Sequence, residues 1–231
     1  MPAEYASRRF QIVGEDIQGA LLRTSPGAAM TGRITLDEPG AGLEPRSVRL
    51  EVAAIAINER PMSTGIATVG DDWSFEIRDV MATGALQVKE PTGQWWIKNV
   101  SVDGRDVSDM PLDFRPGAFS SDVQLLLTRR AAQLSGIVDS RAPGVAIVVF
   151  PSESTLWTPT TRRIAVASPD QAGHFVIGGL PTGAYQVIAI DGFQRGAERH
   201  VATLRTLVGR SDAIQLREGE LKTVNLEVVE R

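Results

Sequence analysis

The chain carries few side chains that could perform catalysis. Among its 231 residues are two histidines, His174 and His200, and no cysteine. Nucleophilic catalysis needs a general base beside the nucleophile, and neither histidine lies in a His-Glu-x-x-His, Gly-x-Ser-x-Gly or phosphate-loop motif. His174 alternates with Phe175 and is expected on the solvent side of a strand, and His200 in a helix. The sequence therefore predicts a non-enzyme that needs no cofactor and no metal.

Three aspartates within "DGRDVSD", namely Asp103, Asp106 and Asp109, offer the oxygen ligands that calcium prefers. Their spacing is not that of an EF-hand loop, and Arg105 places a positive charge between them. Asp-Gly is also a common hairpin turn. We therefore expect a turn here rather than a calcium site.

Tryptophans are the stronger indication of a binding site, and the candidates are Trp95, Trp96 and Trp157. Because side chains alternate along a strand, one of Trp95 and Trp96 should face the core and the other solvent. An exposed ring could hold a sugar or a partner surface by stacking and apolar contact. Trp157 lies in a predicted loop beside Arg162-Arg163. The alternative is that each ring packs at an open sandwich end or under a loop.

Short apolar runs bounded by Gly, Pro, Asp and Ser must position these residues. Runs of this length, rich in Val and Ile, are typical of strands, and their close spacing is typical of β-sandwiches. Helical periodicity occurs over about Ala197–Val208, where Val201, Leu204 and Val208 share one side and Gly209 follows as a stop signal. The predicted strand segments are Ser47–Ile57, Trp73–Ile77, Val123–Leu127, Val145–Phe150 and Thr223–Val229.

An internal repeat organises these runs. "MTGRITL" matches "LSGIVDS", and "DDWSFEIRDVMATGALQVK" matches "QAGHFVIGGLPTGAYQVIA". From the opening glycine to the strand phenylalanine the spacing is 43 residues in one copy and 39 in the other, and from there to a closing valine it is 48 and 49. The first copy has Gly32, Phe75 and Val123 where the second has Gly136, Phe175 and Val224.

The repeat predicts the domain organisation. A first sandwich should span residues 30–130 and a second 131–231. Residues 1–29 look like the last strands of a preceding partial repeat, because "FQIVGEDIQGALLRTSPGA" parallels "VSVDGRDVSDMPLDFRPGA". We therefore expect the chain to be a piece of a longer tandem array.

Composition narrows the partners and the compartment. The formal net charge is −4 with both signs interspersed, which argues against a nucleic-acid partner. No run approaches the roughly 20 apolar residues of a membrane span. The N-terminal segment "MPAEYASRRFQIVGEDI" has no apolar core after a basic start, so it is not a secretory signal.

The pattern "SGIV…GVAIVVFP…PDQAGHFVIGGLPTGAYQVIAID" resembles the carboxypeptidase regulatory-like domain. The resemblance covers the second repeat from end to end and is weaker over the first, where Met81-Ala82-Thr83-Gly84 replaces Leu-Pro-x-Gly. It implies an all-β chain of tandem transthyretin-like or immunoglobulin-like sandwiches, with one short helix in the second. It also implies a non-catalytic module of an exported or cell-surface bacterial protein, periplasmic, outer-membrane-associated or extracellular.

Three functions follow as hypotheses. The first is a structural or interaction module that spaces or presents neighbouring domains of a longer chain. The second is a carbohydrate-binding module that uses exposed tryptophans, with a glycan or protein as ligand; related sandwiches are grouped as a carbohydrate-binding-like fold. The third is a regulatory domain attached to a peptidase. The core is expected to come from Val48, Leu50, Val52, Phe75, Ile77, Ile137, Val148, Phe175, Ile177, Tyr185 and Val187.

Overall fold

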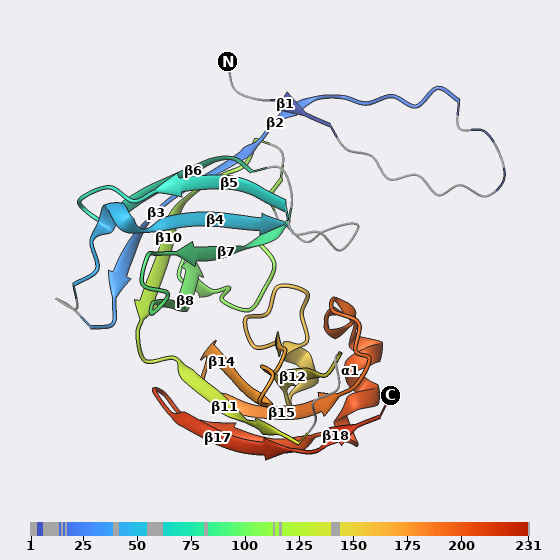
Figure 1. Cartoon of the computed structure of the whole chain (residues 1–231). Helices are drawn as coiled ribbons and strands as arrows, with labels where there is room; N and C mark the ends of the chain where they lie inside the picture. Colours follow the sequence, from blue (N-terminus) through green and yellow to red (C-terminus); the bar gives the residue numbers. More distant parts are fainter. Residues whose placement is uncertain are drawn as a thin grey trace.

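The computed structural model describes residues 4–6, 14, 16, 18–38, 42–54, 62–80, 83–112, 114–115, 117–139 and 144–230. Over these residues the chain is all-β, with two β-sandwiches in tandem and one short α-helix in the second, which confirms the predicted fold class. Figure 1 shows the first sandwich above the second, with the N-terminus at the end remote from the second sandwich.

The first sandwich packs a five-stranded sheet, in the order β6-β3-β10-β8-β9, against a three-stranded sheet, β5-β4-β7. Before it, β1 (Glu4–Tyr5) pairs with β2 (Ser25–Pro26). A 3₁₀ turn, Pro45–Ser47, leads into β4. The strands of the sandwich are β3 (Ala28–Leu36), β4 (Arg49–Ala54), β5 (Met62–Thr68), β6 (Ser74–Val80), β7 (Gly84–Lys89), β8 (Trp96–Val102), β9 (Arg105–Asp106) and β10 (Phe119–Thr128).

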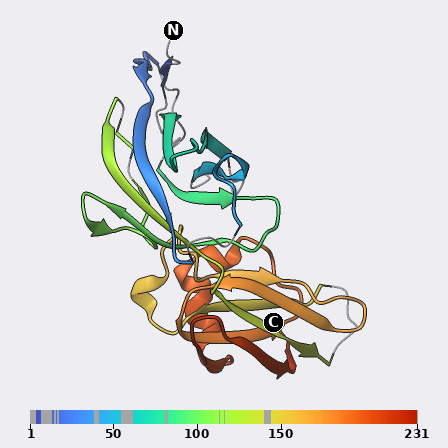
Figure 2. The same ribbon diagram turned by 90° about the vertical axis from the view of Figure 1, so that its left-hand side faces the viewer.

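The second sandwich packs the sheet β14-β11-β17 against the sheet β13-β12-β15-β16, to which β18 adds by pairing with β15. Figure 2 shows the two layers of this sandwich below the first. A 3₁₀ turn, Ser154–Leu156, follows β12. The strands are β11 (Ala132–Val138), β12 (Ala146–Pro151), β13 (Ala165–Ala167), β14 (His174–Leu180), β15 (Gly183–Ile190), β16 (Asp212–Leu216), β17 (Leu221–Leu226) and β18 (Val228–Val229).

The two sandwiches share one pattern of strand pairing, in agreement with the repeat in the sequence. In each sandwich the opening strand runs antiparallel to one neighbour and parallel to the last long strand, so β3 lies between β6 and β10, and β11 lies between β14 and β17. The residues chosen as equivalent are register partners. Gly32 pairs with Phe75 and Val123, and Gly136 pairs with Phe175 and Val224.

The predicted strands are observed with shifted bounds. The expected segment Ser47–Ile57 appears as β4, and its residues 55–57 lie outside the described part of the chain. The expected segment Thr223–Val229 is split between β17 and β18, which belong to different sheets.

Alternation along the strands buries ten of the eleven expected core residues, and Ile137 is the exception. Its side chain is 46% exposed, so its assignment to the core was wrong. On β11 the inward positions are Leu134, Gly136 and Val138, and Ile137 falls between them on the outer face. The first repeat places Arg33 at the same position, so the aligned sequences already carried this signal.

The expected helix is present but interrupted. A 3₁₀ turn, Ala197–Arg199, precedes α1 (Val201–Val208), and His200 between them has extended backbone angles. The buried side is Leu204 and Leu207 rather than Val201 and Val208. These leucines pack against the outward side chains of β12 and β15, including Val148, in a cluster separate from the sandwich core.

The stretch "HFVIGGLPTGAYQVIAID" connects the two layers of the second sandwich. Its arms, β14 and β15, lie in opposite sheets. The Tyr185 hydroxyl donates to the carbonyl of Pro181 at 2.7 Å, which fastens the turn to the following strand, in the manner of the tyrosine corners of immunoglobulin-type sandwiches. Burial raises the pKa of Tyr185 to about 12, so the hydroxyl keeps its proton and remains a donor.

Gly136→Ala should destabilise the second sandwich strongly. A Cβ at this position would lie 1.7 Å from the Val224 carbonyl oxygen, so the parallel strands would have to separate. Overpacking of this kind costs about 1–3 kcal/mol, occasionally more. Urea unfolding measures the effect as a lowered midpoint.

The matched control is Gly209→Ala, because Gly209 has α-helical backbone angles and no atom within 4 Å of an added Cβ. Equal midpoints for the two variants would contradict the close approach.

Candidate interaction site at the junction of the two sandwiches

The tryptophans do not form an exposed platform. Trp95 is 6% exposed in the core of the first sandwich, and Trp157 is 7% exposed beneath α1. The Trp157 Nε1 donates to the carbonyl of Pro151 at 2.7 Å, and its ring lies edge-on to Phe150. Trp95 is the member of the adjacent pair that faces the core, as strand alternation predicts, and Trp157 packs in an apolar cluster, so neither ring is an exposed platform.

Trp96, the outward member of the adjacent pair, lies against the second sandwich. Its ring covers Gly178 and Gly179 near the end of β14. A Cβ on Gly179 would come within 2.4 Å of Trp96 Cδ1, and Gly179 has a positive φ of 79°. The second and third residues of "IGGL" thus provide a flat backbone surface for this ring, since no side chain stands in its way.

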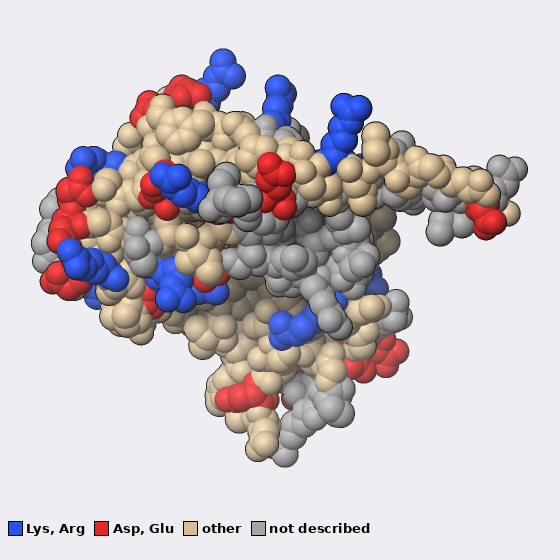
Figure 3. Space-filling view, turned by 90° about the horizontal axis from the view of Figure 1, so that it is seen from above, with Lys and Arg blue, Asp and Glu red and all other residues tan. Residues whose placement is uncertain are grey.

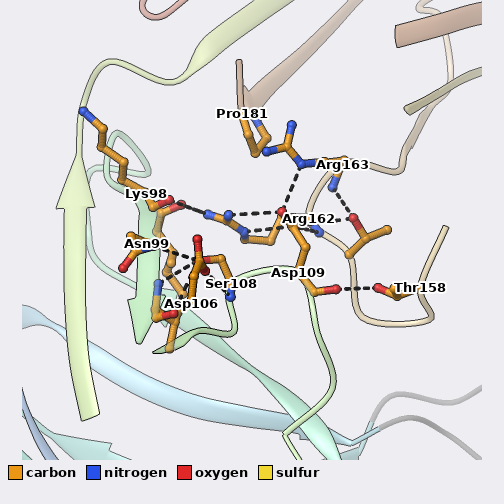
Figure 4. Close-up of polar contacts among 12 residues, drawn as sticks. Lys98, Asn99, Asp106, Ser108, Asp109, Thr158, Arg162, Arg163 and Pro181 are labelled. Carbon is orange, nitrogen blue, oxygen red and sulfur yellow. Dashed lines mark hydrogen bonds and ion pairs between the residues drawn. The ribbon is translucent and has the colours of Figure 1, made fainter. Parts of the chain in front are cut away.

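A polar cluster lies next to this contact (Figure 4). Asp109, in the loop after β9, accepts hydrogen bonds from Arg162 Nε at 3.3 Å and Arg163 Nε at 2.9 Å. The Thr158 hydroxyl donates to the Asp109 carbonyl at 2.6 Å. The three charged side chains are 14%, 18% and 19% exposed in that order. We use the term junction for the contact of Trp96 with Gly178 and Gly179 together with this polar cluster.

Each sandwich holds its part of the junction in place. Asp106 accepts from the backbone N–H of Ser108 at 2.8 Å and from its hydroxyl at 2.6 Å, and this fixes the loop that carries Asp109. On the other side, Arg163 Nη1 donates to the carbonyl of Thr182 at 2.8 Å. The arginine is thereby tied to the turn between β14 and β15.

Arg162 also reaches the backbone of the first sandwich. Its Nη1 donates to the carbonyl oxygens of Ile97 and Lys98, the residues that follow Trp96 on β8. One side chain therefore contacts both the aspartate loop and the strand that presents the tryptophan.

A second set of ion pairs connects the two sandwiches next to the junction, where the chain passes from one sandwich to the other. Lys98 Nζ donates to Asp37 at 2.8 Å and to Glu218 at 2.7 Å, and these carboxylates belong to different sandwiches. The backbone N–H of Gly219 donates to the carbonyl of Arg130 at 2.6 Å. The connecting segment between β10 and β11 is thus bonded to the second sandwich.

The charges of the junction shift the pKa values of its members. Burial alone would raise the pKa of Asp109, but the charge of Arg162 and the hydrogen bond from Arg163 outweigh it and hold this pKa below its ordinary value. The hydrogen bonds of Lys98 to Asp37 and Glu218 raise the pKa of the lysine. Both groups are therefore charged at neutral pH.

The three aspartates of "DGRDVSD" have different surroundings. Asp103 and Gly104 have positive φ angles of 50° and 74° at the tip of the β8–β9 hairpin. Asp106 binds Ser108, and Asp109 binds the arginines. Within the described residues, no group of three or more acidic or histidine side chains could hold a metal ion.

Neither histidine belongs to the junction. His174 is exposed on β14 and its Nδ1 lies 3.5 Å from Asp170 in the preceding turn. His200 is an exposed residue before α1.

The sequence patterns concern the residues of the junction separately and do not predict that they are in contact. Asp109 was assigned to a turn, and Arg162-Arg163 entered only as neighbours of Trp157. A separation of 53 residues divides Asp109 from Arg162. Their burial, which makes an unpaired charge costly, is visible only in the structure, so the sequence carried no signal that joins them.

The surface is of mixed charge. Acidic and basic residues alternate over the coloured part of the face in Figure 3, without a continuous basic stripe. Across the described ranges, no helix has the length and apolar character required to cross a membrane.

No family model matches the chain, and no curated protein matches it. Solved structures with some similarity include the Bacillus anthracis TIE protein (11% identity over 91% of this chain and 37% of that one, TM-score 0.27) and the minor pilin GBS52 of Streptococcus agalactiae (14%, 87% and 94%, 0.28). Two B repeat units of the collagen-binding protein of Staphylococcus aureus also match (11%, 74% and 44%, 0.28). The chain spans only about a third of the TIE protein. TM-scores this low carry no inference about function, so the proposals below do not rest on these structures.

Asp109→Asn should weaken the junction. The substitution keeps the size of the side chain and removes the charge that neutralises two largely buried arginines. Removing one partner from a buried ion pair costs up to about 3–5 kcal/mol, and less where, as here, water reaches the edge. We expect independent tumbling of the two sandwiches, measured by ¹⁵N relaxation on each half.

The control is Asp71→Asn, which breaks the exposed pair with Arg46 on the first sandwich. This variant should tumble like the wild type. A rigid Asp109→Asn protein would show that the cluster does not hold the junction.

The junction should also open in acid. Because the pKa of Asp109 is lowered in the folded protein, its contribution is complete above the ordinary carboxyl pKa of about 3.9 and is lost as the pH falls through the lowered value. The same relaxation measurement should show one rigid body at neutral and mildly acidic pH, and two once the pH has fallen through the lowered pKa of Asp109. Opening between pH 5 and pH 7 would contradict the assignment.

Proposed function

We propose that this chain is a non-catalytic structural module that holds neighbouring domains at a fixed distance and orientation. The observation that carries the proposal is the junction, in which Trp96 and Asp109 of one sandwich are received by Gly179, Arg162 and Arg163 of the other. A flexible pair of domains would need neither contact.

The path of the chain supports a spacer. Since β3 and β10 are parallel, the chain enters the first sandwich at one pole and leaves it at the other. Likewise, β11 and β17 are parallel, so the chain enters the second sandwich at one pole and leaves it at the other. Only residues 129–131 separate β10 from β11. The exit of the first sandwich therefore adjoins the entry of the second, and Figures 1 and 2 show the chain turning there into the lower sandwich.

The division into a first sandwich at 30–130 and a second at 131–231 is part of this proposal. Its support is that each half has its own sheets and its own buried cluster. The segment 1–29 would then be the last strands of a preceding partial repeat of a longer chain.

We further propose that the longer protein is exported and bacterial. The support is the resemblance of the second repeat to carboxypeptidase regulatory-like domains, which also keeps the peptidase-associated role as a weaker possibility. The glycan-binding alternative loses the feature that motivated it, because Trp95 and Trp157 are buried and Trp96 covers Gly178 and Gly179.

Distance measurement between two spin labels tests the spacer. The chain has no cysteine, so Ser121→Cys and Ala213→Cys, both at exposed positions, give one label on each sandwich. We expect a narrow distance distribution in the parent protein. Adding Trp96→Ala and Asp109→Asn should broaden it several-fold, because the ring contact and the ion cluster are both lost.

A control keeps the same labels and adds Asp71→Asn, which should leave the distribution narrow. A broad distribution in the parent protein would exclude a fixed spacing.

A further inference from the structure

The arrangement of the first and last long strands bears on how each sandwich responds to force. In the second sandwich, β11 and β17 run parallel and in register over six consecutive residue pairs, from Gln133 with Leu221 to Val138 with Leu226. In the first, β10 and β3 are in register over five consecutive pairs, from Val123 with Gly32 to Leu127 with Leu36. Each ladder therefore joins the strand that enters the sandwich to a strand near its exit.

Tension between the ends of such a sandwich acts along the strands. The entering strand is pulled from its beginning and the last long strand from its end, in opposite directions, so the strands must slide past each other. All hydrogen bonds of the ladder then carry load together. Were the two strands antiparallel, both attachment points would lie at one pole and the bonds would break one after another.

Details of both ladders oppose sliding. Gly32 and Gly136 let the strands approach so closely that a Cβ would lie 2.1 Å and 1.7 Å from the facing carbonyl oxygens. Further backbone bonds flank the ladders, from Asp37 N–H to the Leu127 carbonyl at 2.8 Å and from Gln133 N–H to the Glu220 carbonyl at 2.9 Å.

The two ladders lie in series along the chain. A load passes from β3 to β10, through residues 129–131, and then from β11 to β17. We propose that the chain is a load-bearing tether, in which the parallel ladders β3–β10 and β11–β17 resist tension in shear. This function deepens the proposed spacer, but it depends on the ladders and not on the junction.

Single-molecule force spectroscopy on the full chain tests the inference. Because the chain lacks cysteine, pairs of introduced cysteines define the points of attachment. Gln133→Cys with Glu227→Cys loads the β11–β17 ladder in shear. Gln133→Cys with Leu221→Cys, which are register partners at one end, peels the same ladder open.

At equal loading rate we expect a rupture force several-fold higher for the first pair than for the second. Forced unfolding follows the unfolding rate under load, so the comparison is independent of equilibrium stability. Both proteins should have the urea midpoint of the parent chain, which excludes damage by the cysteines. Equal rupture forces, or a weaker shear pair, would overturn the proposal.

A third protein separates this test from that of the spacer. Asp109→Asn added to the shear pair opens the junction and leaves the β11–β17 ladder intact. Its rupture force should match that of the shear pair alone. A marked fall would mean that the loss of Asp109 weakens the second sandwich itself, and it would contradict the proposal that the ladder bears load independently of the junction.

Discussion

At Gly32 and Gly136 a side chain larger than hydrogen would collide with the backbone of the facing parallel strand, at the carbonyl of Val123 in one sandwich and of Val224 in the other. Parallel strands at the two ends of a domain have to be brought together across its whole sequence, and the glycine makes room for that approach. Once these strands pair, the chain must enter and leave at opposite poles. The path of the chain through each sandwich and the direction of a load on each ladder follow from this pairing.

The junction has a different role. It fixes the relative orientation of two sandwiches that each have their own apolar core. Apolar burial alone is non-directional, and the Trp96 ring on Gly179 could slide. The ion cluster is directional, because Asp109 receives two arginine Nε atoms while Arg162 also reaches the carbonyls of β8. Charged groups with this little exposure are costly to separate, since each would be left without its partner.

The same packing accounts for side chains that the sequence offers as candidates for a binding site. Trp95 closes the first core and Trp157 the cluster beneath α1. The buried phenol of Tyr185 donates to the Pro181 carbonyl and keeps its proton. Of the three aspartates considered as calcium ligands, Asp103 lies at a hairpin tip, Asp106 fixes a loop and Asp109 belongs to the junction.

The sequence by itself determined the fold class, the repeat and most of the core, because alternation and turn residues act over a few positions and the two copies report on each other. Aligning Gly32 with Gly136 was sufficient to identify strands that pair in the same way, and Arg33 opposite Ile137 would have corrected the one misplaced core residue. Only the tertiary structure decided which tryptophan faces the other sandwich and which charges meet. Asp109 and Trp96 lie on the first repeat and the two arginines on the second. Their contact depends on the relative orientation of the two sandwiches, which no local pattern of apolar and polar residues encodes.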